Sequence, residues 1–212
     1  MSAKLFNWLQ AAPFYMDLHR QAVQLLPIGD QKSWIDVGCG PGLVTRFAAQ
    51  HGYHALGIDP SVASIAMATV IAENLAQNPT QFKAQFRVAD LSELTQLASN
   101  KLGAADVISA CSLLAVLPDR AQALMQLWAA VKPNGYLLIV EPSSQMRLRN
   151  AWSCLHQIPK KRRCALLLWS WARQNNIVDE SIFQRLNHAE IRTYSLLFGL
   201  VRAWVIRKEK RL

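Results

Sequence analysis

Short apolar runs alternate with longer amphipathic stretches along the first two thirds of the chain. Mostly apolar runs of five to nine residues indicate buried strands, and they are residues 33–37, 54–58, 82–88, 106–110, 136–140, 190–197 and 200–208. The stretches between the first five runs, and the stretch before them, predict helices at residues 4–26, 42–51, 61–77, 91–100 and 119–131. This alternation predicts an α/β domain with a doubly wound, mostly parallel sheet.

Three local signals refine this prediction. Pro13 is expected to break or kink the first helix, because proline lacks the amide proton that a helix interior uses. Ser61 is well suited to cap the helix that follows the second strand. Asn134-Gly135 is a turn signal, and we expect it to lead into the fifth strand.

The C-terminal third departs from the alternation. Residues 144–188 are polar, basic and rich in tryptophan, and they predict a helical lid. Only Phe198-Gly199 separates the last two runs, so we expect an antiparallel hairpin that completes a seven-stranded sheet. The whole chain, 1–212, is expected to be a single domain, with N-terminal helices (1–32), a core (33–143), a helical insertion (144–188) and a terminal hairpin (189–212).

Charge is concentrated in the same C-terminal third. Residues 1–143 hold 9 basic and 10 acidic residues, whereas residues 144–212 hold 14 basic and 4 acidic ones, for a formal charge of +9. The basic run Lys160–Arg163 adjoins an apolar run that ends at Trp169. Such a segment can suit an anionic membrane surface or the phosphates of a nucleic acid, and a solvated helix start is the simpler alternative.

Cysteine spacing and the N-terminal sequence indicate in which cellular compartment the protein is expected. Four scattered cysteines form no C-x-x-C pair and no metal-like spacing with the five histidines, which predicts reduced thiols and no metal site. The N-terminal stretch has no continuous apolar core and so predicts no signal peptide, and no apolar run approaches the roughly 20 residues that span a membrane. We therefore expect a cytoplasmic protein.

Polar residues follow the predicted strands at their carboxyl ends, where open α/β sheets bind ligands. These residues are Asp36, Asp59, Asp90, Cys111 and Glu141. The first begins the sequence Asp36-Val-Gly-Cys-Gly-Pro-Gly42, whose glycines let the backbone turn tightly and approach a ligand. Leu43 stands where the dinucleotide fingerprint has its third glycine, which weakens a pyrophosphate site, while Asp59 is placed to accept both hydroxyls of a ribose.

Taken in order, these motifs resemble those of class I S-adenosylmethionine-dependent methyltransferases of the small-molecule type. The motifs are Asp36–Gly42, Gly57-Ile-Asp59, Val88-Ala-Asp90-Leu91, Asp106–Cys111, Leu117-Pro-Asp119 and Val131–Pro142. The resemblance covers about residues 33–143. It implies a Rossmann-like fold, S-adenosyl-L-methionine as cofactor, and methyl transfer to a small, partly apolar acceptor.

The resemblance also implies which residues hold the cofactor. Those expected near its methionine portion are Asp36, Gly38, Gly40, Gly42, Ala110 and Cys111. Those expected near its ribose and adenine are Asp59, Pro60, Ser61, Asp90 and Leu91. In this scheme Asp36 helps to hold the amino group, Asp59 accepts the ribose hydroxyls, and Asp90 accepts from the adenine amino group. A helix N-cap is the alternative role for Asp90.

One departure from the family leaves the catalytic base open. Small-molecule methyltransferases often carry a histidine after the fourth strand, and here Ala115 and Val116 occupy that place. The candidate bases are Tyr15, His19, Glu141 and His156. Structural alternatives exist: Tyr15 and His19 share one helix face, a pattern typical of a partly buried amphipathic helix, and Glu141 stands at a strand end.

Three partners and two other functions remain open at this point. A small-molecule acceptor ranks first, contact with an anionic membrane surface second and nucleic acid third. The alternative functions are methylation of a protein or RNA held by the basic third, and a non-catalytic domain that only binds the cofactor.

Overall fold

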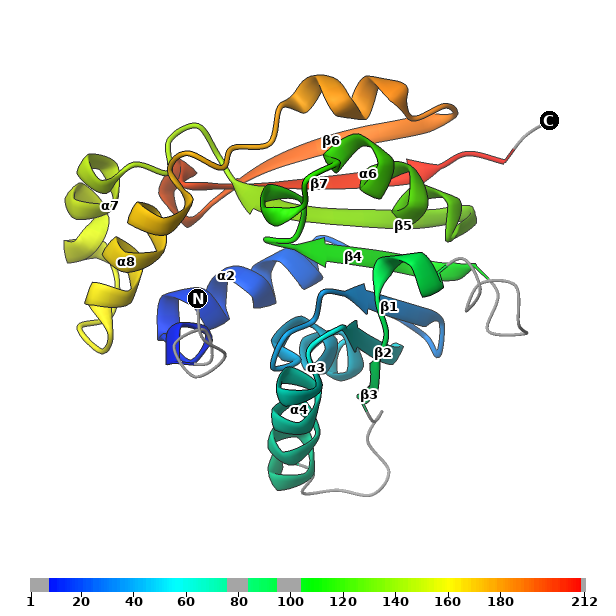
Figure 1. Ribbon diagram of the computed structural model, residues 1–212, viewed down its shortest axis with the longest axis horizontal. Coiled ribbons are helices and arrows are strands. Elements are labelled where there is room, and N and C mark those ends of the chain that lie inside the picture. The colour runs from blue at the N-terminus through cyan, green and yellow to red at the C-terminus, as the bar shows by residue number, and fades with distance from the viewer. Residues whose placement is uncertain (1–7, 76–83, 95–103, 211–212) are drawn as a thin grey trace.

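The computed structural model describes residues 8–75, 84–94 and 104–210, and it places seven strands in one sheet (Figure 1). The strands are β1 (Ser33–Val37), β2 (His54–Asp59), β3 (Gln85–Val88), β4 (Ala105–Cys111), β5 (Val131–Pro142), β6 (Ala189–Leu196) and β7 (Val201–Lys208). The main α-helices are α2 (Pro13–Gln24), α3 (Leu43–Gln50), α4 (Val62–Leu75), α6 (Arg120–Ala129), α7 (Leu148–Cys154) and α8 (Arg163–Arg173). The parts of the predicted elements at residues 4–7, 76–77, 82–83 and 95–100 lie outside the described residues.

The strand order is β3-β2-β1-β4-β5-β7-β6. The five strands from β3 to β5 are parallel, and β7 runs antiparallel to both β5 and β6. The predicted doubly wound sheet with a terminal hairpin is therefore confirmed. The winding reverses between β1 and β4, so a crevice is expected at the carboxyl ends of these two strands.

The local signals near the start of the chain are also confirmed. Residues 8–10 are helical, the helix is interrupted, and Pro13 occupies the first turn of α2, where its missing amide proton costs nothing. Ser61 caps α4, because its Oγ accepts from the amide of Ser64 at 3.2 Å.

Two boundaries differ from the prediction. β5 begins at Val131 and not after Asn134-Gly135. Asn134 adopts a left-handed conformation (φ 62°), and the pairing of β5 with β4 shifts register between Ala105 and Val107. The turn signal therefore marks an irregularity inside the strand and not its start. The β6–β7 connection was predicted as the two residues Phe198-Gly199. It is instead a short 3-10 turn, Leu197–Gly199, followed by Leu200, and three consecutive residues with positive φ make the reversal.

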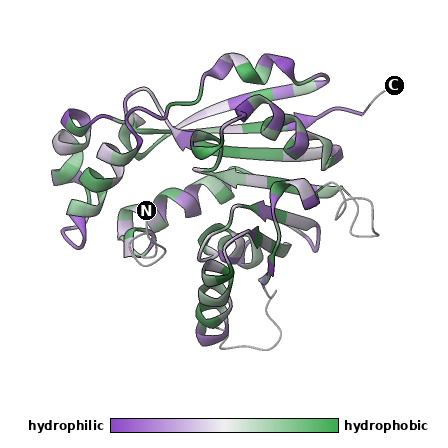
Figure 2. Cartoon of the chain, viewed as in Figure 1, coloured by the Kyte–Doolittle hydropathy of each residue, from purple (hydrophilic) through white to green (hydrophobic). Residues whose placement is uncertain are grey.

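Alternate residues of the central strands face two separate cores. On one face α2 and α3 pack against residues such as Trp34, Val107 and Leu138, and the pair α7–α8 joins the same cluster. On the other face α6 covers Ile35, Ile108 and other residues of opposite parity. Colouring by hydropathy shows green strands at the centre of the sheet, between the layers (Figure 2).

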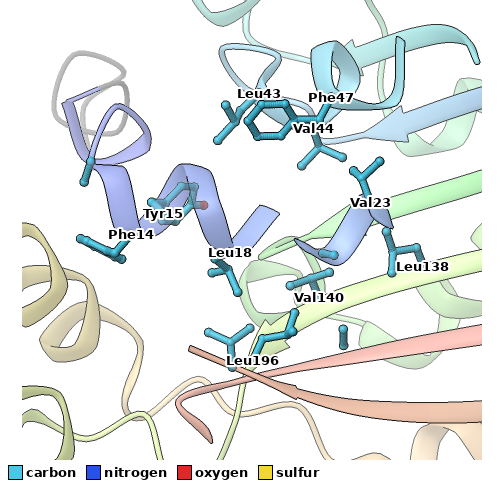
Figure 3. Packing of buried hydrophobic residues seen from close by; sticks show 14 of the residues in the cluster. Phe14, Tyr15, Leu18, Val23, Leu43, Val44, Phe47, Leu138, Val140 and Leu196 are labelled. Atoms are coloured by element: carbon cyan, nitrogen blue, oxygen red, sulfur yellow. The ribbon is translucent and has the colours of Figure 1, made fainter. Parts of the chain in front are cut away.

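Helix α2 occupies the middle of the first core. Phe14, Tyr15, Leu18 and Val23 project from it toward α3 on one side and toward β5 and the end of β6 on the other (Figure 3). The helix therefore crosses the sheet beside the expected crevice. This position brings side chains of an N-terminal helix next to the strand ends.

Residues 144–188 form the expected helical insertion between β5 and β6. It consists of α7, the short 3-10 helix η2 (Leu155–Gln157), α8 and a last 3-10 helix, η3 (Glu180–Arg185). In the ribbon view α7 and α8 lie together at one end of the molecule, beyond α2 (Figure 1). Within the residues that the structure describes, no helix is both long enough and apolar enough to cross a membrane.

The paired isoleucines of the hairpin allow a test of this architecture. Ile206 of β7 is fully buried and stands opposite Ile191 of β6, which is 41% exposed. Ile206→Ala should lower the free energy of unfolding by about 2–5 kcal/mol, because it leaves a cavity in the core. Ile191→Ala should lower it by less than about 1 kcal/mol. Urea unfolding of both variants measures the difference, and equal losses would contradict the placement of the hairpin.

Candidate active site

A small pocket lies where α2 crosses the carboxyl ends of β1 and β4. It is lined by Gln10, Tyr15, His19, Asp36, Gly38, Cys39, Leu43, Val44 and Cys111. Its volume is about 10 Å³, about enough for one water molecule. Five residues that the sequence had singled out separately therefore meet here: Tyr15 and His19 from the helix, and Asp36, Gly38 and Cys111 from the strand ends.

Asp36 is fixed at the end of β1 by two hydroxyl groups. The Oγ of Ser109 donates to its Oδ1 at 2.7 Å, and the Oγ1 of Thr45 donates to its Oδ2 at 2.8 Å. The indole Nε1 of Trp34 in turn donates to the Oγ of Ser109 at 2.8 Å. Burial raises the pKa of Asp36 to about 6, and the two hydroxyl donors act in the opposite direction. The carboxyl group is thus held rigidly beside the glycine-rich loop.

Asp59 anchors the same loop from the end of β2. Its Oδ2 accepts from the amide of Gly40 and its Oδ1 from the amide of Ser61, both at 2.9 Å. The amides of Gly38 and Cys39 donate to the carbonyl of Ile58. The loop after β1 is therefore folded over the end of β2, and the half-buried Asp59 carboxylate stands next to it.

The three glycines of the loop all have positive φ, between 52° and 76°. At Gly42 a β-carbon would lie 2.3 Å from the ring of Phe86 in β3, so close packing alone already requires glycine there. The contact of Gly42 with the cofactor stays a prediction.

Asp90 caps the helical residues 91–94 that follow β3. Its Oδ1 accepts from the amide of Ser92 at 2.8 Å and from the amide of Glu93 at 3.2 Å. These bonds lower the pKa of the exposed carboxyl group. The N-cap role is thus present in the structure, and an adenine contact stays a prediction. Other predicted cofactor residues flank these strand ends: Ala110 is fully buried in β4, Leu91 is half-buried and Pro60 is exposed.

Tyr15 and His19 form a buried aromatic pair, and they also line the pocket. Their ring centroids lie 4.3 Å apart, and the Tyr15 ring meets the ring of Trp169 of α8 at 5.1 Å. His19 Nδ1 donates to the Tyr15 carbonyl at 2.9 Å, which leaves Nε2 as the nitrogen with a lone pair. Burial lowers the pKa of His19 to about 4 and raises the pKa of Tyr15 above its usual range. At neutral pH His19 is therefore an uncharged acceptor.

Glu141 is fully buried at the end of β5. Its Oε1 accepts from the amide of Leu114 at 2.7 Å, at the start of the 3-10 helix η1 (Leu114–Val116). Burial raises the pKa of Glu141 to about 8, while the amide bonds and the charge of Arg173 act to lower it. Glu141 therefore has the structural role at a strand end that the sequence left open, since it binds the start of η1.

Unpaired buried polar atoms gather around Tyr15. Within the residues that the structure describes, buried side-chain atoms without a hydrogen-bond partner are Gln10 Oε1, Glu141 Oε2, Trp169 Nε1, Ser170 Oγ and Arg173 Nε. Three of these belong to α8, and Trp169 packs on Tyr15. The charge of Arg173 acts on both Tyr15 and Glu141. Since buried polar groups are normally paired, this set between α2, α8 and the end of β5 is chemically suited to a polar ligand.

Sequence reasoning missed several of these residues and misjudged one. His156 lies exposed in η2 and does not line the pocket. Gln10, Thr45 and Arg173 gave no local signal, because their roles arise from contacts between distant elements. Ser109 did give one, since a lone polar residue inside an apolar strand often has a specific partner.

The basic run of the insertion is partly used inside the protein. An Arg162 amino group donates to the carbonyl of Trp8 at 2.7 Å and the guanidinium lies over the Trp8 ring, and Arg163 donates twice to the carbonyl of Ile158. Lys160 and Lys161 remain exposed. In the described part of the chain, no three His, Cys, Asp or Glu side chains are grouped as a metal site would require.

Comparison with known proteins decides the family. The family model described as "Methyltransferase domain" matches residues 8–193. The chain belongs to the class I S-adenosylmethionine-dependent methyltransferase family. The resemblance found in the motifs is thereby confirmed.

Curated relatives of this methyltransferase domain include ubiquinone biosynthesis O-methyltransferases. The protein from Coxiella burnetii is 32% identical and that from Acinetobacter baumannii 30% identical, each over 106 residues. The aligned region covers 50% of this chain and 42% of each relative. The chain thus spans less than half the length of these relatives.

Solved structures show the same fold over nearly the whole chain. Magnesium protoporphyrin IX methyltransferase from Synechocystis PCC 6803 superposes with a TM-score of 0.68 at 16% identity, over 97% of this chain and 94% of that one. A plantazolicin methyltransferase superposes with a TM-score of 0.64 at 16% identity, over 97% and 90% of the two chains. At this identity the agreement concerns the fold.

The raised pKa of Glu141 predicts how stability depends on pH. The folded carboxyl group has a pKa of about 8 against 4.5 for an ordinary glutamate, so the folded chain holds a proton that the unfolded chain releases. The contribution of the protonated Glu141 to the free energy of unfolding is complete below pH 4.5 and is lost as the pH rises through 8. The Glu141→Gln variant cannot ionise, so relative to the wild type it should gain up to a few kcal/mol between pH 5 and pH 9.

Urea unfolding of the wild type and the Glu141→Gln variant across that pH range measures the gain. The buried Asp36 contributes equally to both proteins and cancels in the comparison. Parallel stability curves for the two proteins would show that Glu141 is ionised in the folded state.

Proposed function

We propose that the chain transfers the methyl group of S-adenosylmethionine to a small, partly apolar acceptor. The observation that carries this proposal is the pocket in which Asp36 and Gly38, at the end of β1, face Tyr15 and His19 of α2. Cofactor residues implied by the motifs and candidate acceptor residues line one enclosed space. Methyl transfer requires such proximity, because the donor carbon and the acceptor atom must lie in line and away from water.

The residues present fit the cofactor. Asp36 and Gln10, whose Oε1 is unpaired, supply two acceptors to the lining of the pocket, which suits an ammonium group. Asp59 stands at the end of β2, where a carboxylate can accept ribose hydroxyls. When bound, S-adenosylmethionine supplies an electrophilic methyl group.

The chain's own residues would then position the acceptor and manage its proton. Leu43, Val44 and Trp169 provide apolar surface around Tyr15 and exclude water. His19 Nε2 can accept a proton, since Nδ1 already holds one in its bond to the Tyr15 carbonyl. The unpaired atoms of Glu141 and Arg173 can bond a polar group on the acceptor. We assign the role of base to His19, and the roles of Glu141 and Arg173 to acceptor positioning.

The names of relatives support a small-molecule acceptor. The curated relatives are O-methyltransferases of ubiquinone biosynthesis, and the structural neighbours are named for plantazolicin and magnesium protoporphyrin IX. Methylation of protein or RNA is the alternative, as is cofactor binding without catalysis. The cytoplasmic location and the extent of the domain over residues 1–212 also stay predictions.

The role of Asp59 can be tested by binding. Asp59→Ala should weaken affinity for S-adenosylhomocysteine by about 10- to 100-fold, because charge-assisted bonds to the ribose are lost. Isothermal titration calorimetry measures the change. Asp179→Ala is the matched control, since the Asp179 carboxylate also accepts from a backbone amide, that of Ser181, but caps the remote helix η3. Unchanged affinity in Asp59→Ala would contradict the cofactor site.

Catalysis by His19 can be separated from binding. His19→Phe keeps a ring beside Tyr15 but removes the proton acceptor, so transfer should fall by about 10²–10⁴-fold. Affinity for S-adenosylhomocysteine should stay within about threefold. The assay follows the methyl label from S-adenosylmethionine into the small-molecule fraction of a cell extract, with the protein and RNA fractions counted separately.

Each result of that assay decides between the alternatives. Label in the small-molecule fraction supports the proposal, whereas label confined to protein or RNA contradicts it. Tight cofactor binding without label in any fraction would favour a non-catalytic domain. Full activity of His19→Phe would remove His19 from the mechanism.

A further inference from the structure

The helical pair α7–α8 exposes large apolar side chains that the core does not use. Trp152 is 69% exposed, Trp171 66% and Leu168 51%. Leu148 and Cys164 are exposed as well. We call these five residues the outer face of the helical pair. Scattered single apolar residues are normal on a surface, but a group of this size on adjacent helices marks an interaction site.

Helical spacing gathers the outer face into two stripes. Leu148 and Trp152 are four residues apart on α7, and Cys164, Leu168 and Trp171 follow at intervals of four and three on α8. Such intervals place side chains on one side of a helix.

The opposite side of each helix is committed to the core. On α8 the buried residues are Ala165, Leu166, Trp169 and Ser170, and on α7 they are Ala151 and Cys154. Both helices are therefore anchored from inside while their exposed stripes remain free. The hydropathy colouring shows green and purple segments alternating along this pair (Figure 2).

The segment that carries the outer face has charge of one sign. Residues 142–178 contain seven basic residues and no Asp or Glu. Four of the seven are exposed: Arg147, Arg149, Lys160 and Lys161. Arg162 and Arg163 bond backbone carbonyls of the protein itself. The exposed set lies next to the residues of the two apolar stripes in the sequence, and its charge complements an anionic surface.

Aliphatic side chains distinguish a bilayer from a nucleic acid as the partner. Single-stranded nucleic acid binds to basic residues and aromatic rings, on which its bases stack. Leu148 and Leu168 offer no such stacking surface, yet they lie in the same stripes as the two tryptophans. Leucine and tryptophan on one face with basic residues beside them are typical of helices that lie in the headgroup region of a membrane.

We propose that the outer face of the helical pair docks the protein on an anionic lipid bilayer. Trp152, Trp171, Leu148 and Leu168 enter the headgroup region, and Arg147, Arg149, Lys160 and Lys161 contact the lipid phosphates. The contact is peripheral. It does not depend on the proposed methyl transfer, because none of these residues lines the pocket.

Vesicle flotation tests the proposal on the full chain. Vesicles of phosphatidylcholine and phosphatidylglycerol in equal parts should bind the protein, and vesicles of pure phosphatidylcholine should bind it at least tenfold less. The four-residue variant R147Q/R149Q/K160Q/K161Q should lose about fivefold per residue at low salt. The control K32Q/R185Q/R207Q/K210Q removes the same net charge from exposed positions elsewhere and should bind nearly as well as the wild type.

The apolar contribution has its own pair of variants. W152S/W171S should reduce binding to the anionic vesicles at least tenfold, whereas I28S/V70S removes comparably exposed apolar side chains elsewhere and should change it less than threefold. Circular dichroism and affinity for S-adenosylhomocysteine check that each variant is folded. The proposal is overturned by absent vesicle binding, by equal losses in target and control variants, or by RNA binding that depends on the same residues while vesicles remain unbound.

Discussion

The buried carboxyl group of Asp36 joins the elements around which the site is built. It stands at the end of β1, and its two oxygens accept from Thr45 of α3 and Ser109 of β4. Trp34 extends the network to the first core through Ser109. A buried carboxyl group without such partners would be strongly destabilising, so these residue types depend on one another. The network fixes the relative positions of β1, β4 and α3, and hence the crevice that the glycine-rich loop and α2 close.

The sequence predicts most of the scaffold because the scaffold rests on local signals. Apolar runs mark strands that are buried on both faces, and the order of strands and helices determines the winding of the sheet. The errors fall where backbone conformation is unusual. Asn134 and Leu197–Gly199 adopt positive φ, a conformation that Asn and Gly adopt readily but that tertiary packing must impose on Leu and Phe. These residues account for the two mispredicted features, the start of β5 at Val131 and the length of the hairpin turn.

The site was predictable only in part, for a different reason. Strand-end residues such as Asp36 and Asp59 are placed by topology, whereas Tyr15 and His19 on the opposite side come from α2, and α8 packs behind Tyr15. Periodicity shows that Tyr15 and His19 share a helix face, but a face lined by a pocket and a face sealed in a core have the same period. Gln10 and Arg173 carry no motif at all. Trp169 and Trp171 are two residues apart, and only the fold shows that the first is buried against Tyr15 and the second exposed.

Helix α8 unites the two proposals through its opposite faces. Its inner face carries Trp169, Ser170 and Arg173, whose buried polar atoms have no hydrogen-bond partner among the residues that the structure describes. Its outer face carries Leu168 and Trp171 to solvent. Both features reduce stability when the chain is isolated, because an unpaired buried donor and an exposed indole each forgo favourable interactions. A helix with only a structural role would be more stable with apolar residues in place of the unpaired inner ones and polar residues in place of the exposed apolar ones. Their joint presence is consistent with binding on both sides, an acceptor inside and a lipid surface outside. An acceptor with an apolar body partitions into that same surface, and a protein docked through the outer face of α8 would hold the inner face of this helix, on which Tyr15 of the pocket packs, about one helix diameter (about 10 Å) from it.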